Sequence, residues 1–229
     1  MTNREIILGR IREALKISAP HPAFSEKAQI PSPPNLFQSS FQKWLPPVGE
    51  TSDEQIELFR QNSENLKTDF RVCADVNEAV QYVKTLAVEN HWGKIGTHHG
   101  ELTNAVAREL NLPKVQTDSG YAIADLESCD AGLTECESLI AQTGSVLVSA
   151  HSAGGRALSV LPPHHIVLAR KNQMTPNLSI ALQRAREKFG DTFPSFLSFI
   201  TGPSRTGDIE RILVLGAHGP KKLTILILP

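Results

Sequence analysis

Short loops that combine glycine with hydroxyl, imidazole or guanidinium groups hold the residues best suited to chemistry in this 229-residue chain. Glycine lets backbone N–H groups approach an anion closely, and serine and threonine add hydroxyl donors. In open α/β sheets, ligands usually bind outside the carboxyl ends of the strands. We therefore expect a small anion to bind among these loops, which span residues 96–100, 142–145, 152–156, 201–208 and 216–220.

Each loop also has a purely structural interpretation. A Thr-Gly-Ser sequence between two apolar runs (143–145) is commonly a hairpin turn, and Gly216 or Gly219 could serve a turn with positive φ. Asp208 could cap the segment that follows it. The pair His164–His165 enters an apolar run, so in a strand the two rings point to opposite faces and would not share a metal.

Charge and composition exclude several classes of protein. The formal net charge is −1, and no run of Lys or Arg makes a basic stripe, so the chain does not look like a nucleic-acid-binding protein. The longest apolar stretches, such as 223–228, are far shorter than the ~18–20 residues that span a bilayer. The first 16 residues are charged throughout without a small-residue cleavage site. The sequence therefore predicts no signal peptide and a cytoplasmic protein.

The three cysteines, Cys73, Cys129 and Cys136, do not form a metal-binding pattern. No C-x-x-C occurs, a [4Fe–4S] cluster usually needs four thiolates, and the spacings do not suit a zinc site. We expect three free, buried thiols and no metal or cofactor in this chain. The common nucleotide-binding and hydrolase motifs G-x-x-x-x-G-K-[ST], G-x-G-x-x-G and G-x-S-x-G are also missing.

The N-terminal part is predicted to be a helix followed by an extended arm. Thr2 and Glu5 form a capping-box pattern, and apolar residues recur at helical spacing up to Lys16. Residues 19–47 are too rich in proline for a regular helix, and too apolar for a simple linker. We therefore divide the chain into residues 1–50, the helix and arm, and residues 51–229, one α/β domain.

The body alternates helices and strands up to about residue 118, which predicts a mainly parallel sheet with helices on its faces. The second half changes this pattern. A hairpin is expected around 142–145, the sequence HHIVLAR is expected to be a strand, and a helix is expected over 175–189. The final ILVLGAHGPKKLTILIL is expected to be another hairpin. The predicted fold class is α/β, with a mixed, mainly parallel sheet flanked by helices.

Three segments of the second half resemble the lactate utilisation protein C family, whose domain is called the LUD domain. They read LTECESLIAQTGSVLVSA, GRALSVLPPHHIVL and ITGPSRTGDIERILVLGAHGPKKLTILIL. The resemblance is strong over 129–229, follows only the order of elements over 51–118, and is loose before that. The last segment, with its G-P-S-x-T-x-D-I-E and H-G-P patterns, is the most specific.

This resemblance implies a fold similar to that of ribose-5-phosphate isomerase and coenzyme A transferases. It also implies a role in oxidising L-lactate to pyruvate beside two iron–sulfur partner proteins. The carboxylate candidates for catalysis are Glu135, Asp208 and Glu210. Many relatives carry glutamate where this chain has Gln142, so Glu135 or Glu210 would have to replace that carboxylate. The ligand-binding candidates among the family's conserved positions are Thr143, Gly144, Arg156, Gly202, Ser204, Thr206, His218 and Gly219.

Three functions follow as alternatives. The first is a subunit of a lactate-oxidising complex that has no redox centre, with the iron–sulfur clusters in its partners. The second is an independent enzyme, of isomerase or coenzyme A transferase type, acting on a small anionic substrate. The third is an interaction module that docks through its N-terminal helix and arm, which could also join copies of this chain. For the first two, we expect loops 202–208 and 218–219 to form one anion-binding pocket with Thr143 and Gly144.

Overall fold

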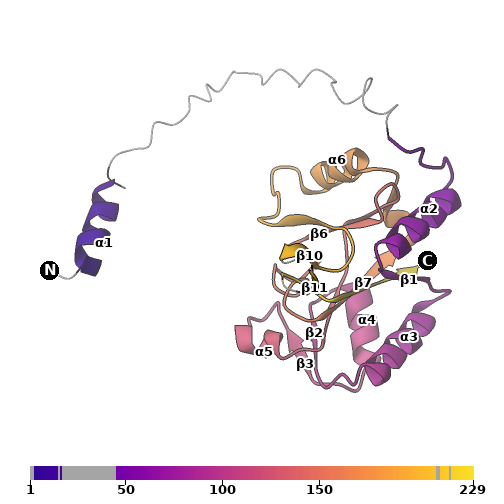
Figure 1. Cartoon of the computed structure of the whole chain (residues 1–229), viewed down its shortest axis with the longest axis horizontal. Helices are drawn as coiled ribbons and strands as arrows, with labels where there is room; N and C mark the ends of the chain where they lie inside the picture. The colour runs from indigo at the N-terminus through magenta and orange to yellow at the C-terminus, as the bar shows by residue number, and fades with distance from the viewer. Residues whose placement is uncertain (1–2, 15, 17–44, 210–211, 217) are drawn as a thin grey trace. The chain divides into compact units, whose positions relative to one another are not determined.

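The computed structural model describes residues 3–14, 16, 45–209, 212–216 and 218–229 (Figure 1). Two compact units make up the chain, Met1–Pro46 and Pro47–Pro229. The described helix of the first unit is α1 (Asn3–Ala14), where the sequence predicted a helix, and Thr2 of the predicted capping box lies outside the described residues. Nearly all of the expected arm also lies outside them.

A six-stranded sheet forms the centre of the second unit, with strand order β1-β12-β7-β4-β2-β3. All its neighbouring strands are parallel. The central strands β7 and β12 are buried along almost their whole length, as continuous apolar runs in parallel sheets usually are. The strands are β1 (Asp69–Val72), β2 (Ile95–Thr97), β3 (Lys114–Gln116), β4 (Ala131–Thr134), β7 (His164–Arg170) and β12 (Lys222–Leu228).

A second sheet has the order β8-β5-β6-β9 and is mixed, because β5 and β9 run antiparallel to β6 while β8 runs parallel to β5. The predicted hairpin around 142–145 is confirmed as the β5–β6 pair. A separate antiparallel ribbon joins β10 to β11. These strands are β5 (Ser138–Ile140), β6 (Ser145–Ser149), β8 (Met174–Thr175), β9 (Leu197–Ile200), β10 (Arg205–Ile209) and β11 (Ile212–Leu215).

Helices and the second sheet cover the two faces of the six-stranded sheet. α3 and α4 pack on one face, against residues such as Leu133 and Ile166. α2 and the four-stranded sheet pack on the other, where Phe59 and Val146 meet Ile225. α6 covers the outer side of the second sheet, so α6 and the α3–α4 pair lie at opposite ends of the body in Figure 1. The helices are α2 (Ser52–Asn65), α3 (Val76–Glu89), α4 (Glu101–Glu109), α5 (Ile123–Glu127), α6 (Leu178–Phe189) and the 3₁₀ turn η2 (Lys171–Gln173).

Local capping explains where the helices begin. Thr51 accepts a hydrogen bond from the backbone of Glu54, whose carboxylate receives the Thr51 N–H at 2.9 Å, which completes a capping box for α2. Asp75 caps α3 and Asn177 caps α6 through their side chains. The predicted helix over 175–189 therefore starts later than expected, because Thr175 belongs to β8 and Asn177 caps the helix.

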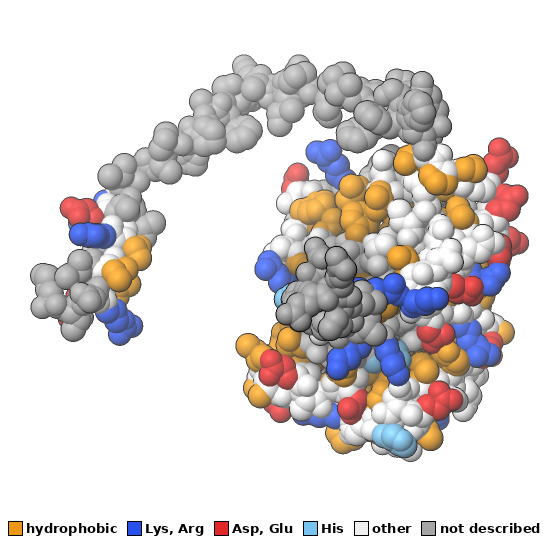
Figure 2. Space-filling model, viewed as in Figure 1, with side chains coloured by type: hydrophobic (Ala, Val, Ile, Leu, Met, Phe, Trp, Pro, Cys, Tyr) orange, Lys and Arg blue, Asp and Glu red, His pale blue; other side chains and the backbone are white. Residues whose placement is uncertain are grey.

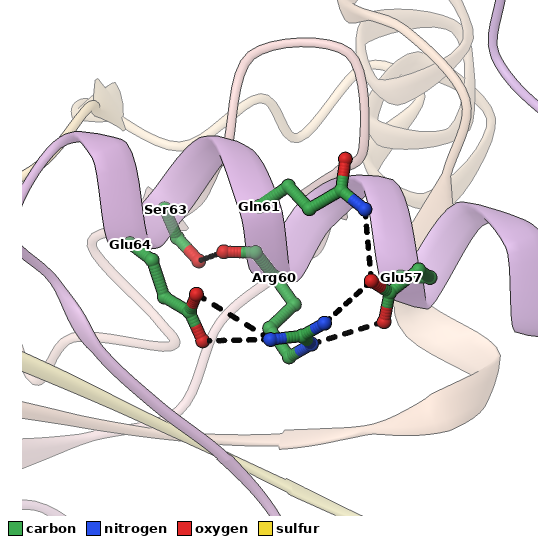
Figure 3. Close-up of polar contacts among 5 residues, drawn as sticks. All are labelled: Glu57, Arg60, Gln61, Ser63 and Glu64. Carbon is green, nitrogen blue, oxygen red and sulfur yellow. Dashed lines mark hydrogen bonds and ion pairs between the residues drawn. The ribbon is translucent and has the colours of Figure 1, made fainter.

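The outer surface of α2 carries an ion-pair cluster (Figure 3). The guanidinium of Arg60 lies between the carboxylates of Glu57 and Glu64, one turn away on either side. All three side chains are substantially exposed to solvent. Pairs of this kind stabilise a helix only slightly. This face of α2 is therefore a solvated face, and not a candidate site.

The pairing of the last strands differs from the sequence expectation. The predicted hairpin of β11 with β12 is wrong, because β11 pairs with β10 and β12 lies between β1 and β7 in the other sheet. The apolar run LTILIL is buried on both faces, which an edge hairpin cannot provide. The segment 216–221 consequently connects β11 to β12 in a different sheet, and is not the turn of a hairpin.

Candidate functional site

The principal candidate site is a cavity of about 490 Å³ that we call the loop cavity. Its walls come from the end of β9, the following loop to Arg205, and the loops that precede β1, β7 and β12. It therefore lies at the amino ends of the central parallel strands, and not at the carboxyl ends where a ligand was expected. The described lining residues are Leu66, Ser159, Val160, Phe196, Ser198, Phe199, Ile200, Thr201, Gly202, Pro203, Ser204, Arg205, His218, Gly219 and Pro220.

Two of the expected loops do meet in this cavity. The Ser204 N–H donates to the carbonyl of Pro220 at 2.9 Å, and the Gly216 N–H donates to the carbonyl of Ser204 at 3.0 Å. A Cβ on Gly219 would lie 3.3 Å from the Ser204 Cβ, so glycine permits the close approach. Gly202 adopts a φ of +82° beside Leu66, a conformation that glycine tolerates best. The structure thus brings Gly202, Ser204, His218 and Gly219 together.

The polar groups of the loop cavity favour an anionic ligand. Arg205 donates a hydrogen bond to the carbonyl of Leu66, which holds its guanidinium at the wall. His218 is exposed there, and Ser204 adds a hydroxyl. No Asp or Glu is among the described residues that line the cavity. Lys and Arg side chains also gather across the middle of the face of the body seen in Figure 2.

Thr143 and Gly144 lie one residue layer behind the loop cavity. The Ser145 hydroxyl donates to Thr143 Oγ1 at 2.7 Å and accepts from the hydroxyl of Thr201, a lining residue, at 2.8 Å. Gly144 has a φ of +63°, and a Cβ there would lie 2.7 Å from the backbone nitrogen of Ser63 in α2. Neither Thr143 nor Gly144 is among the cavity-lining residues, and Gly144 serves the contact between this turn and α2.

Arg156 lies beside the cavity wall. Its guanidinium donates to the carbonyl of Ser195 at 2.8 Å and is centred 5.9 Å from the ring of Phe196, which does line the cavity. Arg156 therefore positions the segment that leads into β9. The backbone of Thr206 and Asp208 belongs to β10, their side chains are not described, and Glu210 lies outside the described residues.

Glu135 lies at the carboxyl ends of the parallel strands, opposite to the end at which the loop cavity lies. It follows β4, and its Oε1 accepts from the backbone N–H groups of Leu102 at 2.8 Å and Thr103 at 3.1 Å. These N–H groups belong to the first turn of α4 and have no acceptor within the helix, and the capping residue Gly100 has no side chain that could accept from them. A Cβ on Gly100 would overlap the Glu135 carboxylate. Glu135 therefore occupies the place where a helix would bind an anionic ligand.

His98 completes this second arrangement at the carboxyl ends of β2 and β4, where the strand order reverses. The Glu135 N–H points at His98 Nε2 at 3.3 Å, so Nε2 accepts and Nδ1 donates to the carbonyl of His99 at 3.1 Å. Burial is the main cause that lowers the pKa of His98. The loop containing Ser152 and Gly154 packs over it, since a Cβ on Gly154 would approach His98 Cβ within 2.5 Å. Protein groups thus fill this crevice.

The histidine pair and the cysteines are buried in separate surroundings. The rings of His164 and His165 point to opposite faces as predicted, with Nε2 of His164 bonded to Thr224 and Nε2 of His165 bonded to Thr134. Burial raises the pKa of the Cys73 thiol to about 11, so this thiol stays protonated near neutral pH. Among the described residues, no group of three or more His, Cys, Asp or Glu side chains could hold a metal ion.

Sequence reasoning missed several cavity-lining residues. Leu66 ends α2, Ser159 and Val160 precede β7, and Phe196 precedes β9, so these residues come from distant parts of the chain. The hydrogen bond from Arg205 to the carbonyl of Leu66, for example, joins positions 139 residues apart. Only the sequence GRALSV, which lies inside a segment with a family resemblance, contained a signal for Ser159 and Val160. Leu66 and Phe196 gave none.

Comparison with known families and proteins identifies relatives of this chain. The LUD domain family matches residues 56–228. The lactate utilization protein C of Macrococcus caseolyticus is 35% identical over 189 residues, which cover 79% of this chain and 80% of that protein. The protein of the same name from Bacillus velezensis is 23% identical over 241 residues, covering 99% and 96%.

Other matches are shorter or structural. In the match to the lactate utilization protein C of Shouchella clausii, at 33% identity, the chain spans about half of that curated relative (48%). The crystal structure of a DUF162 family protein from Deinococcus radiodurans superposes with a TM-score of 0.64 at 18% identity. It covers 79% of this chain and all of that one, which shows a shared fold. No helix among the described residues is both long and apolar enough to cross a membrane. Because the family match extends over most of its length, the chain belongs to the LUD domain family.

Proposed function

We propose that this protein takes part in L-lactate utilisation as a component without a redox centre, and that it binds a small anionic ligand in the loop cavity. The relatives named lactate utilization protein C that align over most of both chains support the role. The observation that carries the ligand assignment is the meeting of Ser204, Arg205 and His218 around a cavity with no carboxylate among its described lining residues.

Oxidation of L-lactate to pyruvate releases two electrons and two protons. In this proposal the electrons pass to iron–sulfur clusters held by partner proteins, and the protons pass to solvent. The three described cysteines of this chain are separately buried, and burial raises the pKa of each thiol. This chain supplies a binding surface for the anion and for its partners, rather than the path of the electrons.

Ligand-induced stabilisation tests the site. A ligand at a hundredfold its Kd stabilises the native state by about 2.7 kcal/mol. We expect a rise in Tm with one of lactate, pyruvate, sugar phosphates, coenzyme A or folates, and its loss when Ser204→Ala and Thr206→Ala are combined. The matched control is Ser119→Ala, at an exposed serine away from the cavity. A ligand-induced rise that survives in the double variant would place the anion elsewhere.

Growth and co-purification test the role. A host lacking this protein should fail to grow on L-lactate, and the wild-type chain should restore growth while the Ser204→Ala/Thr206→Ala variant does not. The tagged wild-type chain should retain iron–sulfur proteins from a native lysate of lactate-grown cells. Normal growth of the deletion strain on L-lactate would reject the role and leave the binding site standing as a separate question.

An independent enzyme acting on a small anion is the second candidate. The arrangement of Glu135, His98 and the first turn of α4 favours it, because this is the strand-reversal position at which α/β proteins commonly bind substrates. Movement of the loop that carries Gly154 would have to open this crevice. Turnover of a sugar phosphate or acyl-coenzyme A by the purified chain, abolished by Glu135→Gln, would favour this candidate over the first.

A further inference from the structure

The strand β9 forms an open edge of the four-stranded sheet, where β6 is its neighbour. The Ala150 N–H donates to the carbonyl of Phe196 at 3.0 Å. Bonding direction alternates along an antiparallel strand, so Ser198 also bonds to β6, whereas Leu197 and Phe199 point their N–H and C=O groups away from it. Among the described residues, no hydrogen bond outside the sheet reaches the backbone of Leu197 or Phe199.

The other three edges of the two larger sheets are protected against pairing. The edge strand β1 carries Asp69 and Arg71, β3 carries Lys114, and β8 has two residues that are both buried. Charged residues, short length and cover are the usual devices that keep a strand edge from pairing with another chain. β9, with the sequence LSFI, has no charge and is partly exposed along its whole length. It is therefore the edge that is ready to accept another strand.

Open space lies beside this edge. Phe196 and residues 198–201 line the loop cavity, so the cavity follows β9 from end to end. On the facing wall, Val160 is 42% exposed and Leu66 is partly exposed. An extended segment in this position would bond to the backbone of β9, and its alternate side chains would meet these apolar groups.

Cationic side chains lie at both ends of β9. Arg156 donates to the carbonyl of Ser195 at 2.8 Å just before the strand, and Arg205 lines the cavity just after it. Both are exposed, and among the described residues neither forms an ion pair with a carboxylate. Two copies of this chain that paired through β9 would set arginine against arginine in either strand direction, which is unfavourable. An acidic segment complements these charges.

We propose that β9 binds an extended, acidic segment of another protein by strand addition. The segment bonds to the N–H and C=O groups of Leu197 and Phe199, and one of its carboxylates lies beside Arg156. This inference rests on the loop cavity as the binding site of the proposed function, whose small anion lies at the other end of β9, beside Ser204 and Arg205.

A synthetic peptide, EEVTVTVTEE, tests strand addition to the full chain by isothermal titration calorimetry. Two further versions carry backbone N-methyl groups on alternate residues, one on the odd and one on the even positions. An added strand uses one row of its N–H groups, so one version should bind as tightly as the parent and the other at least tenfold more weakly. Equal affinities of the two methylated versions, or no binding of the parent, would overturn the proposal.

Charge is tested with the peptide KKVTVTVTKK, which should bind at least tenfold more weakly than EEVTVTVTEE. Arg156→Gln should reduce this preference at least threefold. A basic peptide that binds as tightly as the acidic one would contradict the assignment of an acidic partner.

A matched pair of variants tests the backbone of β9. Phe199→Ala and Phe199→Pro both lose the aromatic ring, but only proline also removes the N–H group that points outward. Proline is tolerated at such a position of an edge strand. We expect Phe199→Pro to bind EEVTVTVTEE at least tenfold more weakly than Phe199→Ala does. Equal affinities in the two variants would show that this N–H group takes no part.

Hydrogen exchange on the unaltered chain covers the case in which these variants do not fold. The amides of Leu197 and Phe199 should exchange at least tenfold more slowly when EEVTVTVTEE is saturating, while the Ser198 amide is slow throughout. Unchanged exchange at both amides would place the peptide elsewhere and refute the assignment. A dimer of the chain that the peptide dissociates would instead make β9 a contact between copies, which also overturns it.

The outcome is separable from that of the proposed function. Peptide binding without a rise in Tm from any of the small anions would leave strand addition standing alone. A rise in Tm from a small anion without peptide binding would overturn strand addition alone.

Discussion

Adjacent glycines in the loop after β6 show how closely single residues pack around His98. Gly154 and Gly155 both have positive φ, +56° and +100°, but only Gly154 lies against other side chains. A Cβ on Gly154 would overlap Thr117 and His98, whereas a Cβ on Gly155 would meet no atom within 4 Å. The two positions therefore separate backbone strain from steric overlap.

We expect Gly154→Ala to destabilise the fold by about 2–5 kcal/mol, the sum of left-handed strain and overpacking. Gly155→Ala, which carries the strain alone, should cost about 1–2 kcal/mol. The free energy of unfolding from urea titrations measures both. Equal losses in the two variants would mean that the loop does not press on His98 in solution.

Three buried histidines predict a loss of stability on mild acidification. Burial lowers the pKa of His98, of His164 to about 4 and of His165 to about 3. The unfolded chain binds these protons near pH 6.5, while the folded chain does not. The stabilising contribution is therefore complete above about pH 6.5, and it is lost as the pH falls from there towards the folded pKa values.

The expected slope approaches about 1.4 kcal/mol per pH unit for each of His164 and His165 between pH 6 and 5, and His98 adds to it in the same direction. Unfolding free energies at pH 7, 6 and 5 measure it, and His165→Gln should reduce the slope by the share of one histidine. The exposed His91 provides the control, since His91→Asn keeps a side chain that tolerates its positive φ. An unchanged slope in His165→Gln would show that His165 is protonated in the folded state.

From the sequence we could predict some of the residues that meet at the loop cavity, but not which of the other candidate residues serve the fold. Gly202, Ser204, His218 and Gly219 meet as expected, because short-range patterns of glycine and hydroxyl residues mark loops at the ends of apolar runs. Glu135, expected to be catalytic, caps α4 at the carboxyl ends of the strands instead. Gly144, expected to bind a ligand, packs on α2. Those contacts join positions 32 residues apart or more, and no local pattern encodes them.

Element boundaries depend on caps that can be tested singly. Thr51→Ala should lower the free energy of unfolding by about 1 kcal/mol, because the hydroxyl of Thr51 no longer accepts from Glu54 N–H in the first turn of α2. Thr51→Ser keeps the hydroxyl and should stay within about 0.5 kcal/mol of the wild type. Chemical denaturation checks both variants. A serine variant as unstable as the alanine variant would assign the loss to the methyl group.

The elements themselves were largely predictable, whereas the pairing of the last strands was not. Alternating helix and strand patterns gave the order of the first half, and HHIVLAR and the Gln142–Ser145 hairpin were predicted. The turn-like GAHGP between two apolar runs indicated a hairpin, yet β12 inserts between β1 and β7. The insertion of β12 between β1 and β7 follows from the burial of its two faces, and that burial depends on elements distant in sequence.

At the scale of the whole molecule, we predict that the body folds without the first 46 residues. The boundary at Pro46 separates two units, and in α1 the side chains of Ile7, Leu8 and Ile11 are exposed. A chain of residues 47–229 should keep its Tm within a few degrees but associate more weakly with itself or a partner, as the arm hypothesis requires. Calorimetry and analytical ultracentrifugation measure the two properties.

The matched control for the truncation is the full chain with Ile7→Ser and Ile11→Ser, which removes the apolar stripe and keeps the length. If this variant associates as weakly as the truncated chain, the stripe carries the association. A truncated body that fails to fold would instead show that the first 46 residues belong to its core.

The position of β12 also sets the order in which the protein can fold during synthesis. Thr224 bonds to Asp69, 155 residues earlier, and β12 separates β1 from β7. At about 5–20 residues per second, β1 waits roughly 8–30 s after its own synthesis for the strand that joins it to the sheet. In the later part of that interval, after β7 (His164–Arg170) has been made, its edge towards β12 is open, and an exposed, apolar strand edge invites pairing with other nascent chains. Ribosome-bound chains that end before β12 should therefore stay bound to chaperones, whereas chains extended by a linker that lets residue 228 leave the exit tunnel should release them.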